Sequence, residues 1–546
     1  MTTNVNTTST PRVDRRRFLS LSAGAATAVA ASGLLTACGG STGADTQKGG
    51  AGSVRFPAYK AATPVKPALP ATADGVMAGF YDYPADPVRA FSAPPGKGLD
   101  SITAMTSIVT QVPPGVGSNT YWQALNKQLG ADLKLTMARD VDYPAKLSTV
   151  ISGGDLPDMM LISAKLSHRA DVLTRTCADL SEFVSGSAIK EFPFLANIPH
   201  DAWLSTAYGG GIYAIPIPRA VVGTIMFART DLIRKHGLDP SPSSYAEFAK
   251  LAKDVSDDKA HRWAFGSAKY AVTFIGNTLG VPNGWREKGG RFTSEYETEQ
   301  RKEALARAAE LAKAGTFHPD AMGNKLQIRD LFGNGTLVFN SDGYAAWDLL
   351  ADTYGIEVGT LAAPKYDGGG VAGHRAGATS YGITAFKKAD KKRVRQLLKV
   401  CDWLASPLGT REYMFRRFGV EGTHYTMKDG RPAPTKTGKA EVALPLEYIA
   451  ASPHVLGPGD HDRVDAQRAY QEKVVPSIVR NPSEGLYSPT AVDKAGEMGK
   501  VIDQAELDIV FGRKPVSSWD ETVKEWRRAG GDAARREYEK AFAARN

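Results

Sequence analysis

The sequence predicts an α/β fold, and three observations support this prediction. Strand-like and helix-like segments alternate from residue 101 onward. The strand expected at Asp158–Ile162 is apolar from Met159 onward, which is typical of strands buried on both faces of a parallel sheet. The chain has 546 residues, enough for two lobes or for two or three domains.

Hydrophobic periodicity predicts the first elements. Ser101–Val112 is expected to be a strand that runs into a Pro-Pro-Gly turn. Thr120–Leu129 predicts a helix that ends at Gly130. Ala131–Met137 alternates like a half-buried strand, and Tyr143–Ile151 follows as a helix. The resulting strand-helix-strand-helix-strand order favours right-handed parallel crossovers.

The later elements continue this pattern. Two further strands are expected at Ile212–Ile217 and Val221–Phe227. Helices are expected at Tyr245–Val255, Glu299–Ala314, Lys391–Ala405, Trp519–Ala529 and Asp532–Ala544. Gly530-Gly531 separates the last two helices. Cys401 lies on the broad apolar face of the helix at Lys391–Ala405, so we expect it in the core.

Composition and charge exclude several classes of protein. Hydrophobic residues make up 42% of the chain and charged residues 23%, which is typical of a globular protein rather than a disordered one. The formal net charge of +9 is spread over a long chain, and no basic patch is interleaved with aromatic residues. We therefore expect no nucleic-acid partner.

The three cysteines are Cys38, Cys177 and Cys401. They are too few for a disulfide framework, and no pair has the spacing of zinc ligands. Cys177 and Cys401 could form a disulfide with each other after export, or both could lie buried as free thiols. We favour buried thiols, because a chain of this size needs no covalent staple.

The first 38 residues have the features of an export signal. Arg15-Arg16-Arg17-Phe18-Leu19 resembles a twin-arginine signal, and a mildly apolar stretch follows up to Leu35. Leu35-Thr36-Ala37-Cys38 resembles a bacterial lipobox, whose cysteine receives the lipid. Residues 1–37 are thus predicted to be a signal peptide and Cys38 the acylated (palmitate-type) anchor on the extracellular face of the membrane. The alternatives are a plain signal peptide with a chance cysteine and a mitochondrial-type presequence.

Residues 38–98 are rich in Gly, Ala, Thr and Pro. Few large apolar residues recur in this stretch, so it is predicted to be a flexible tether between the anchor and the body.

Several motifs occur in an order that resembles one known family. Ile151–Asp158 (ISGGDLPD) resembles a turn that precedes a buried strand, in which Pro157 stops the helix and Asp158 can bond the backbone of the turn. The other motifs are YPAKL at Tyr143–Leu147, ADL at Ala178–Leu180, GIYAIP at Gly211–Pro216, RTDL at Arg229–Leu232, EGTHY at Glu421–Tyr425 and WDETV at Trp519–Val523. On these motifs the chain resembles the extracellular sugar-binding proteins of ABC importers.

This resemblance implies an α/β, two-lobed periplasmic-binding-protein-like fold with a hinge and an interlobe ligand cleft. Lobe I would comprise residues 99–217 and 375–425, and lobe II residues 218–374 and 426–546. The resemblance also implies a monomer without a cofactor that captures a carbohydrate, with an oligosaccharide favoured. The solute would pass to the permease subunits of an ABC importer. The resemblance does not identify the solute and does not tell whether a structural calcium is bound.

Candidate ligand-binding residues follow from the rule that ligands bind beyond the carboxyl ends of strands. Ser163 and Lys165 follow the strand that ends at Ile162, and the family places a polar contact near Lys165. Arg219 follows the predicted crossover and could bond hydroxyls or an acidic sugar. His424 could close the site from the other side. The alternatives are a solvated surface lysine for Lys165, an interlobe ion pair for Arg219 and turn packing for His424.

Aromatic side chains provide stacking platforms for sugar rings. Tyr344 follows a strand-to-helix junction where the family often places such a ring, and Trp285 lies in a glycine-rich loop. Tyr270 is a third candidate in a cleft loop. Trp122 and Trp347 are expected in the core, because they lie on apolar helix faces.

No catalytic constellation is evident, and we expect neither catalytic residues nor a metal. There is no HExxH motif and no phosphate-binding loop. Asp460-His461-Asp462 is a compact polar group that could bind a metal, but such triplets are common on surfaces. A surface-anchored glycosidase or polysaccharide lyase is the enzyme alternative, since paired carboxylates are recognised only in space. A lipoprotein adhesin is the structural alternative.

Overall fold

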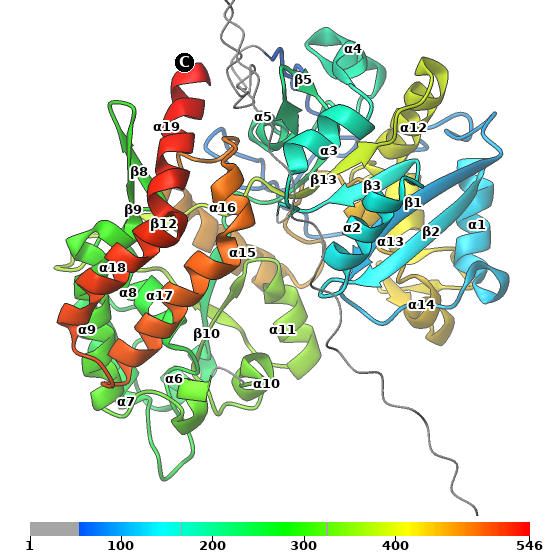
Figure 1. Cartoon of the computed structure of the whole chain (residues 1–546). Coiled ribbons are helices and arrows are strands. Elements are labelled where there is room, and N and C mark those ends of the chain that lie inside the picture. The colour runs from blue at the N-terminus through cyan, green and yellow to red at the C-terminus, as the bar shows by residue number, and fades with distance from the viewer. Residues whose placement is uncertain (1–53, 165, 324–325, 546) are drawn as a thin grey trace, which may run out of the picture. The chain divides into compact units, whose positions relative to one another are not determined.

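The first lobe is built on a five-stranded mixed sheet (Figure 1). In the computed structural model, which describes residues 54–164, 166–323 and 326–545, the strand order is β2-β1-β3-β13-β6. The strands are β1 (Ser101–Ile108), β2 (Asp132–Arg139), β3 (Met159–Ile162), β6 (Ala214–Pro218) and β13 (Ser380–Phe386). β1 is parallel to β2 and β3, whereas β13 is antiparallel to β3 and β6. The carboxyl ends of the other four strands therefore share one edge with the start of β13.

Helices cover both faces of this sheet. The helices on one face are α1 (Thr120–Leu129) and α12 (Lys391–Leu404), and those on the other are α2 (Tyr143–Gly153) and α3 (Arg169–Thr176). Alternation along β1 explains the division, because Ile102 and Ala104 enter the core under α1 while Met105 enters the core under α2. The apolar strand β3 contributes to both cores, as predicted for a strand buried on both faces.

The second lobe contains a three-stranded antiparallel sheet of order β10-β7-β11. Its strands are β7 (Thr224–Ala228), β10 (Phe339–Gly343) and β11 (Gly359–Leu361). One core joins this sheet to α7 (Tyr245–Asp254), α8 (Ala268–Thr278), α9 (Glu299–Lys313), α17 (Ala495–Val510) and α18 (Trp519–Trp526). The opposite face packs on α11 (Ala346–Tyr354) and α15 (His461–Val474).

The remaining elements are short, apart from α19. The helices are α4 (Ser181–Val184), α5 (His200–Trp203), α6 (Thr230–Lys235), α10 (Ile328–Gly333), α13 (Arg411–Phe418), α14 (Lys436–Glu441), α16 (Pro489–Asp493) and α19 (Asp532–Arg545). The strand pairs are β4 (Ala207–Tyr208) with β5 (Gly211–Ile212), β8 (Trp285–Lys288) with β9 (Arg291–Ser294), β12 (His374–Arg375) with β16 (Ile478–Val479), and β14 (Tyr425–Lys428) with β15 (Arg431–Pro434).

The predicted helices are confirmed, and capping residues and glycines explain where they begin and end. At α1, the Asn119 side chain accepts the N–H of Trp122 at 2.8 Å, and Gly130 takes the left-handed conformation that ends the helix. Gly530, with φ of 149°, marks the break that was expected between the two C-terminal helices. The strand predicted from Val221 begins instead at Thr224, because Val221–Gly223 crosses between the lobes.

Two crossing segments touch closely at a pair of glycines. Gly377 donates its N–H to Val221 O at 2.9 Å, and Arg219 donates its N–H to Thr379 O at 3.0 Å. A Cβ on Gly223 would lie 2.4 Å from the Cα of Gly377, so neither position has room for a side chain. These two of the connections between the lobes are therefore tied to each other.

The second boundary of the first lobe lies later than predicted. Residues 426–451 were expected in the second lobe, yet Leu444, Leu446, Ile449 and Ala450 belong to the core that contains α1 and α12. The chain joins the core of the second lobe at Leu456. The sequence hides this boundary, because the stretch has few long periodic elements.

Residues 54–98 form an ordered N-terminal strap, which corrects the predicted tether over this range. Its first part lies on the first lobe, where Ala58 donates its N–H to Gly186 O at 2.9 Å. Its middle part lies on the second lobe, where Val76 is 3% exposed and Phe80 donates its N–H to Leu456 O. Its last part returns to the first lobe, where Val88 bonds Gly409 O. The strap thus contacts both lobes (Figure 1, dark blue).

The strap has little secondary structure of its own, which explains why its composition suggests a tether. A few spaced apolar side chains hold it, and Pro, Gly and Ala between them leave the chain extended. Residues 1–37 with the predicted signal, and Cys38 with the predicted lipid, lie outside the described residues.

Cys177 and Cys401 are both buried free thiols, as favoured from the sequence. Cys401 lies in the core of the first lobe, where its Sγ is 3.6 Å from Met159 Sδ. Burial raises the pKa of each thiol. Within the described ranges, no helix combines the length and the apolarity needed to cross a bilayer.

Candidate functional site

Aromatic side chains gather where β6 ends and β13 begins. Tyr381, the second residue of β13, stacks on Tyr448 with ring centroids 4.7 Å apart and ring planes at 27°. Arg219 follows β6 directly and holds its guanidinium carbon 4.6 Å from the centre of the Tyr381 ring. All three side chains are partly exposed. This edge of the sheet therefore combines apolar ring faces with a forked hydrogen-bond donor.

The Tyr381 ring is held in place by its hydroxyl. The hydroxyl donates to Asp140 Oδ1 at 2.8 Å and lies 3.5 Å from Ser107 Oγ. Burial, with a contribution from Asp140, raises the pKa of Tyr381 to about 12, so the hydroxyl stays protonated at neutral pH. Asp140 and Ser107 come from the ends of β2 and β1, so four strand ends fix one ring.

His454 extends this group of side chains. Its Nε2 lies 3.3 Å from Arg219 Nη1. Surrounding protein lowers the pKa of His454 to about 4, and the charges of Arg219, Arg417 and Arg416 contribute in the same direction. The ring is nevertheless exposed to solvent.

Arg416 and Arg417 occupy the last turn of α13. The guanidinium carbon of Arg416 lies 5.6 Å from the centre of the Tyr413 ring. Arg417 is exposed to solvent. The surrounding protein lowers its pKa, but Tyr413, Glu447, Tyr83 and Asp348 together raise it above the ordinary value. Tyr83 belongs to the strap and Asp348 to α11 of the second lobe. The groups that act on Arg417 thus come from both lobes and from the strap.

Of the predicted ligand-binding residues, Ser163 and Arg219 lie at this edge. Ser163 follows β3 and Arg219 follows β6, and β13 runs between these two strands. Lys165 lies outside the described residues. The interlobe ion pair considered for Arg219 is not formed among the described residues, since its polar contact is the His454 ring.

Tyr344 does not present a ring to the crevice, and its position corrects that expectation. Its side chain is 7% exposed and packs with Trp347 and Tyr470 in the core of the second lobe. Its hydroxyl donates to Gln467 O at 3.2 Å, and burial raises its pKa. The expectation that Trp347 and Trp122 lie in the core is confirmed, with exposed fractions of 2% and 5%.

Trp285 and Tyr270 lie apart from the stacked tyrosines. Trp285 packs in an aromatic cluster with Phe292, Trp526 and Tyr538, the first from the β8–β9 hairpin and the others from the C-terminal helices. Tyr270 is half-buried on α8, and its pKa is raised by burial and by Asp342. Among the described residues, neither makes a hydrogen bond or ring contact with Arg219, Tyr381 or His454, and both remain predictions as ligand contacts.

His424 is buried, which corrects its predicted place beside the solute. It is 1% exposed, and its Nδ1 accepts the backbone N–H of Val420 at 3.0 Å. Its Nε2 faces Thr120 Oγ1 at 3.0 Å and Glu441 Oε2 at 3.4 Å. Glu441 in turn accepts the N–H groups of Thr120 and Tyr121 at the start of α1. Turn packing, the alternative considered for His424, describes its role.

The group Thr120, His424 and Glu441 has the residue types of a catalytic triad but not the arrangement. Because Nδ1 accepts a hydrogen bond, the ring proton resides on Nε2. A general base needs a free lone pair on the nitrogen that faces the hydroxyl, and here that nitrogen is a donor. The group therefore supports a helix terminus rather than nucleophilic catalysis.

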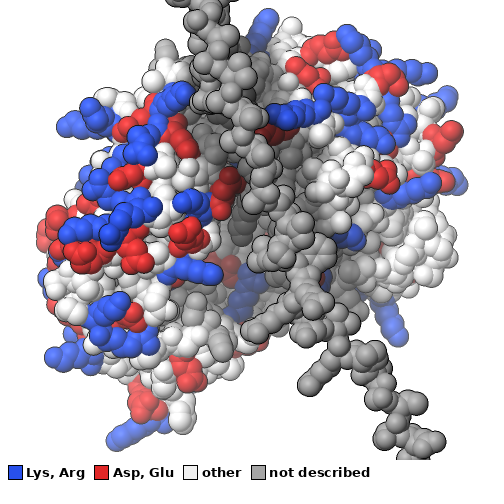
Figure 2. Space-filling model, in the orientation of Figure 1, with Lys and Arg blue, Asp and Glu red and all other residues white. Residues whose placement is uncertain are grey.

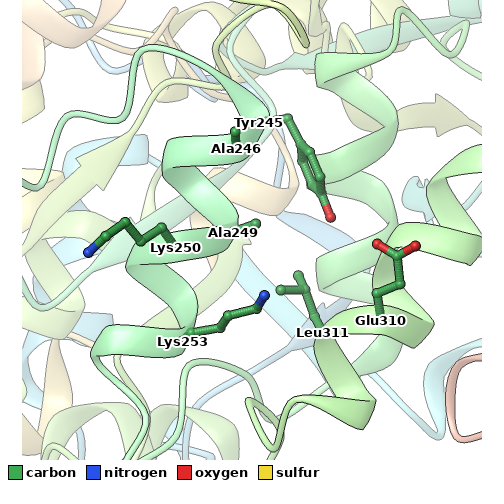
Figure 3. Close-up of a pocket in the computed structure, with 7 residues that line it drawn as sticks. All are labelled: Tyr245, Ala246, Ala249, Lys250, Lys253, Glu310 and Leu311. Atoms are coloured by element: carbon green, nitrogen blue, oxygen red, sulfur yellow. The ribbon is translucent and has the colours of Figure 1, made fainter.

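Outside this edge of the sheet, the metal-ligating groups and hollows of the described residues give no second candidate site. No cluster of three or more His, Cys, Asp or Glu side chains able to hold a metal occurs among the described residues. Asp460 instead accepts the N–H of Arg463 as the N-cap of α15, and His461 contacts Asp82. A hollow of about 330 Å³ lies on the outer surface between α7 and α9, where the Tyr245 hydroxyl, the Glu310 carboxylate and the Lys253 amine converge (Figure 3). It contains none of the predicted site residues.

Charges of both signs are mixed on the surface. On the face shown in Figure 2, Lys and Arg side chains are interspersed with Asp and Glu on both sides of the view. Many charged side chains of the described residues form close pairs, such as Lys250 with Asp254 and Lys302 with Asp520. Mixed charge of this kind keeps a protein soluble and does not build a single-sign field.

Sequence reasoning missed Tyr381, Tyr448, His454, Arg416 and Arg417. A signal existed for Tyr381, because it is the second residue of the strand after the predicted crossover at residue 375. The others lie in loops or a helix end more than thirty positions away, and only the tertiary fold brings them to the sheet edge.

Residues 120–416 match the family model described as bacterial extracellular solute-binding protein. The chain belongs to this family. As a member it is an extracellular solute-binding protein, and the proteins of its family bind solutes for transporters. The predicted two-lobed solute-binding fold is confirmed by structural relatives that cover most of the chain.

Relatives of known name support this assignment. The polygalacturonan/rhamnogalacturonan-binding protein YtcQ of Bacillus subtilis (strain 168) is 23% identical over 497 residues, which cover 86% of this chain and 96% of the relative. Lipoprotein LipO of the same organism is 21% identical over 479 residues, 81% of this chain and 92% of the relative. The crystal structure of the alginate-binding protein AlgQ2 without calcium ion shares the fold, with 18% identity, a TM-score of 0.58, and coverage of 84% of this chain and 99% of that one.

Proposed function

We propose that this solute-binding protein captures an oligosaccharide outside the cell and delivers it to the permease subunits of an ABC importer. The observation that carries the proposal is the stacked pair of Tyr381 and Tyr448 beside Arg219, at the ends of the first-lobe strands. Sugar rings offer C–H faces to aromatic rings and hydroxyls to forked donors. The carbohydrate named for YtcQ supports the same class of solute.

Closure of the two lobes would complete the site. A solute that contacts both lobes binds the closed state better and so shifts the population toward it. Arg219 and Ser163 would contribute from the first lobe, with Lys165 beside them. Polar groups of the second lobe would contact the solute from the opposite side.

We propose further that Cys38 is the lipidated N-terminus and that the protein leaves the cell by the twin-arginine route. The lipobox, the arginine motif and the relationship to lipoprotein LipO support this. Cys38→Ala should release the protein from the membrane fraction with loss of acyl mass. Arg15→Lys with Arg16→Lys should block export, and normal export would point to the general secretory route instead.

The carbohydrate proposal is tested with the chain from residue 39 onward, which contains every described residue. Thermal unfolding is followed against a panel of neutral and acidic oligosaccharides, because a ligand at 100 times its dissociation constant adds about 2.7 kcal/mol of stability. Each hit is then incubated at length and its products are analysed. We expect binding without turnover. Product formation would support the glycosidase or lyase alternative, and no response to any saccharide would overturn the proposal.

A further inference from the structure

A second group of aromatic rings and an arginine lies at the start of α3. The guanidinium carbon of Arg169, the first residue of α3, lies 5.5 Å from the centre of the Tyr208 ring and 5.9 Å from that of Tyr487. The two rings meet edge to face with their centroids 6.1 Å apart. Tyr208 is 6% exposed, whereas Arg169 and Tyr487 are partly exposed. We call Arg169 and Tyr487 the second platform, and Tyr381 with Tyr448 the first platform.

The second platform lies at the same edge of the first-lobe sheet as the first. Helix α3 follows β3, whose carboxyl end is at that edge, beside the start of β13. Tyr381, Tyr448 and Tyr487 all pack, partly buried, against one core, the core under α2 and α3. Glu484, three residues before Tyr487, accepts the hydroxyl of Thr379 at 2.9 Å, and Thr379 directly precedes β13. The two platforms are therefore neighbours along the edge.

Tyr487 comes from a loop of the second lobe, between β16 and α16. The residues on either side of the loop belong to that lobe, since β16 packs against its core and Thr490 of α16 donates its N–H to Glu537 of α19 at 3.0 Å. The loop itself reaches the first lobe, where Arg480 pairs with Asp201 at 2.6 Å. Both lobes thus contribute to the second platform, as expected for a solute held between them.

Arg169 has no carboxylate partner. It forms no ion pair within 4.0 Å among the described residues, and its buried Nε has no hydrogen-bond partner there. Arg175, at the other end of α3, instead pairs with Asp171 at 3.7 Å. A buried donor left unpaired is costly, so a guanidinium held against two rings without a carboxylate is typical of a binding site. Such a fork can donate to the hydroxyls of a sugar whose ring lies against the neighbouring tyrosine.

We infer that Arg169 and Tyr487 form a second saccharide subsite, and that this subsite makes the protein prefer a solute long enough to reach both platforms. The inference rests on the proposed carbohydrate function and deepens it. A short saccharide fills the first platform alone, where two stacked rings offer the larger apolar face. A longer saccharide adds ring contact with Tyr487 and hydrogen bonds with Arg169, so its dissociation constant is lower.

The test compares saccharides that differ only in length. The probes are oligomers of galacturonate, of xylose and of α-1,4-linked glucose, each with two, four and six units. They are titrated calorimetrically into the chain from residue 39 onward. In a series that binds, the affinity for the six-unit probe should exceed that for the two-unit probe at least about tenfold.

Variants assign the gain in affinity to the second platform. Tyr487→Ala and Arg169→Gln should each weaken binding of the six-unit probe on the order of tenfold, yet change binding of the two-unit probe by less than about twofold. Tyr448→Ala, at the first platform, should weaken binding of both probes. If Tyr487→Ala and Arg169→Gln weaken both lengths equally, these residues support the fold of the edge and form no subsite.

Two further variants are matched controls. Tyr213→Ala removes a tyrosine that is partly buried against the same core but precedes β6, at the opposite edge of the sheet. Arg175→Gln removes an exposed arginine from the other end of α3. Both should bind every probe like the parent protein. Circular dichroism and unliganded thermal unfolding check that each variant is folded, and if one of the two second-platform variants is not, the other decides.

The outcomes separate this inference from the proposed function. Equal affinity for the two-unit and six-unit probes overturns the second subsite and leaves carbohydrate capture standing. A length preference that Tyr487→Ala and Arg169→Gln leave intact in folded protein does the same. Failure of every saccharide to bind removes both proposals together.

Discussion

Asp402 is a buried carboxyl group on α12 with 2% of its surface exposed. It accepts the backbone N–H groups of Phe194 and Leu195 at 2.8 and 2.9 Å, which ties an irregular segment to the helix. Burial nevertheless raises its pKa to about 7, above its ordinary value of 3.8. Between these two values the folded state holds a proton that the unfolded state lacks, so its contribution to stability falls as the pH rises from about 4 to about 7.

Asp402→Asn should therefore stabilise the protein at high pH. The amide oxygen can still accept both N–H groups, and the charge is gone. We expect a gain of about 2–4 kcal/mol at pH 8 that vanishes near pH 4. Denaturant unfolding of both proteins at pH 4, 6 and 8 measures the difference. The pKa of buried His374 is lowered to about 4, so its own contribution to stability rises with pH. This contribution is the same in both proteins and cancels in the comparison. A difference that does not change with pH would contradict this account.

Tyrosine substitutions separate the site from the core. Tyr448→Ala removes a partly exposed ring face and should weaken solute binding by about 2 kcal/mol, or roughly thirtyfold, with little change in unfolding temperature. Tyr344→Ala empties a packed position and should lower stability by about 3 kcal/mol. Its solute affinity should stay close to that of the parent. Calorimetric titration and thermal unfolding of both variants check this, and the reverse pattern would show that the site is misplaced.

At the scale of elements, Asp158 joins the sheet to α12. It is 1% exposed and accepts the N–H and hydroxyl of Thr103 at 2.8 and 3.0 Å. Arg393 of α12 pairs with it at 2.7 Å. Burial alone would raise the pKa of Asp158, but Arg393 and Thr103 outweigh it and lower the pKa. The sequence suggested that Asp158 bonds its own turn, whereas it bonds the neighbouring strand and a helix.

Asp158→Asn should cost about 2–4 kcal/mol of stability, because it leaves Arg393 facing an uncharged amide in a largely buried place. Glu182→Gln is the matched control, since Glu182 pairs with the exposed Lys391 of the same helix and should cost less than about 1 kcal/mol. The Asp158 contribution is present above pH 4 and is lost as the pH falls below it. Urea unfolding at pH 7 and pH 3 measures both variants, and equal costs would contradict the assignment.

The helices and strands could be predicted from the sequence more fully than the candidate site, because their signals are local and those of the site are not. Helix α1 follows from local information, namely an apolar period, an Asn cap and a terminal glycine. The candidate site joins Arg219, Tyr381, Tyr448 and His454, whose proximity depends on how two lobes fold back on each other. Tyr344 illustrates the limit, because its strand-to-helix junction was recognised but the Tyr470 ring that packs on it comes from α15.

For the whole molecule, the strap and the glycine-tied crossings couple the two lobes. Truncation to start at Leu99 would expose the surfaces on which Val76 and Phe80 are buried. We expect it to lower stability by several kcal/mol, since each buried side chain of this size contributes about 1.5–3 kcal/mol. Truncation to start at Val54 keeps the strap and should unfold like the chain from residue 39. Differential scanning calorimetry compares the three, and equal unfolding temperatures would mean that the strap contributes nothing.

If Cys38 carries the proposed lipid, the strap also limits how far the protein can move from the membrane. With Cys38 as the anchor, only residues 38–53 lie between the lipid and the first strap residue that contacts the body. Whatever its conformation, such a segment spans at most about 55 Å, whereas a free segment over residues 38–98 would span about 210 Å. The volume that the receptor can search shrinks roughly fiftyfold with that reach. Under the lipid-anchor proposal, the protein stays within about 55 Å of its lipid, so the proposed encounter with a permease would take place close to the membrane surface.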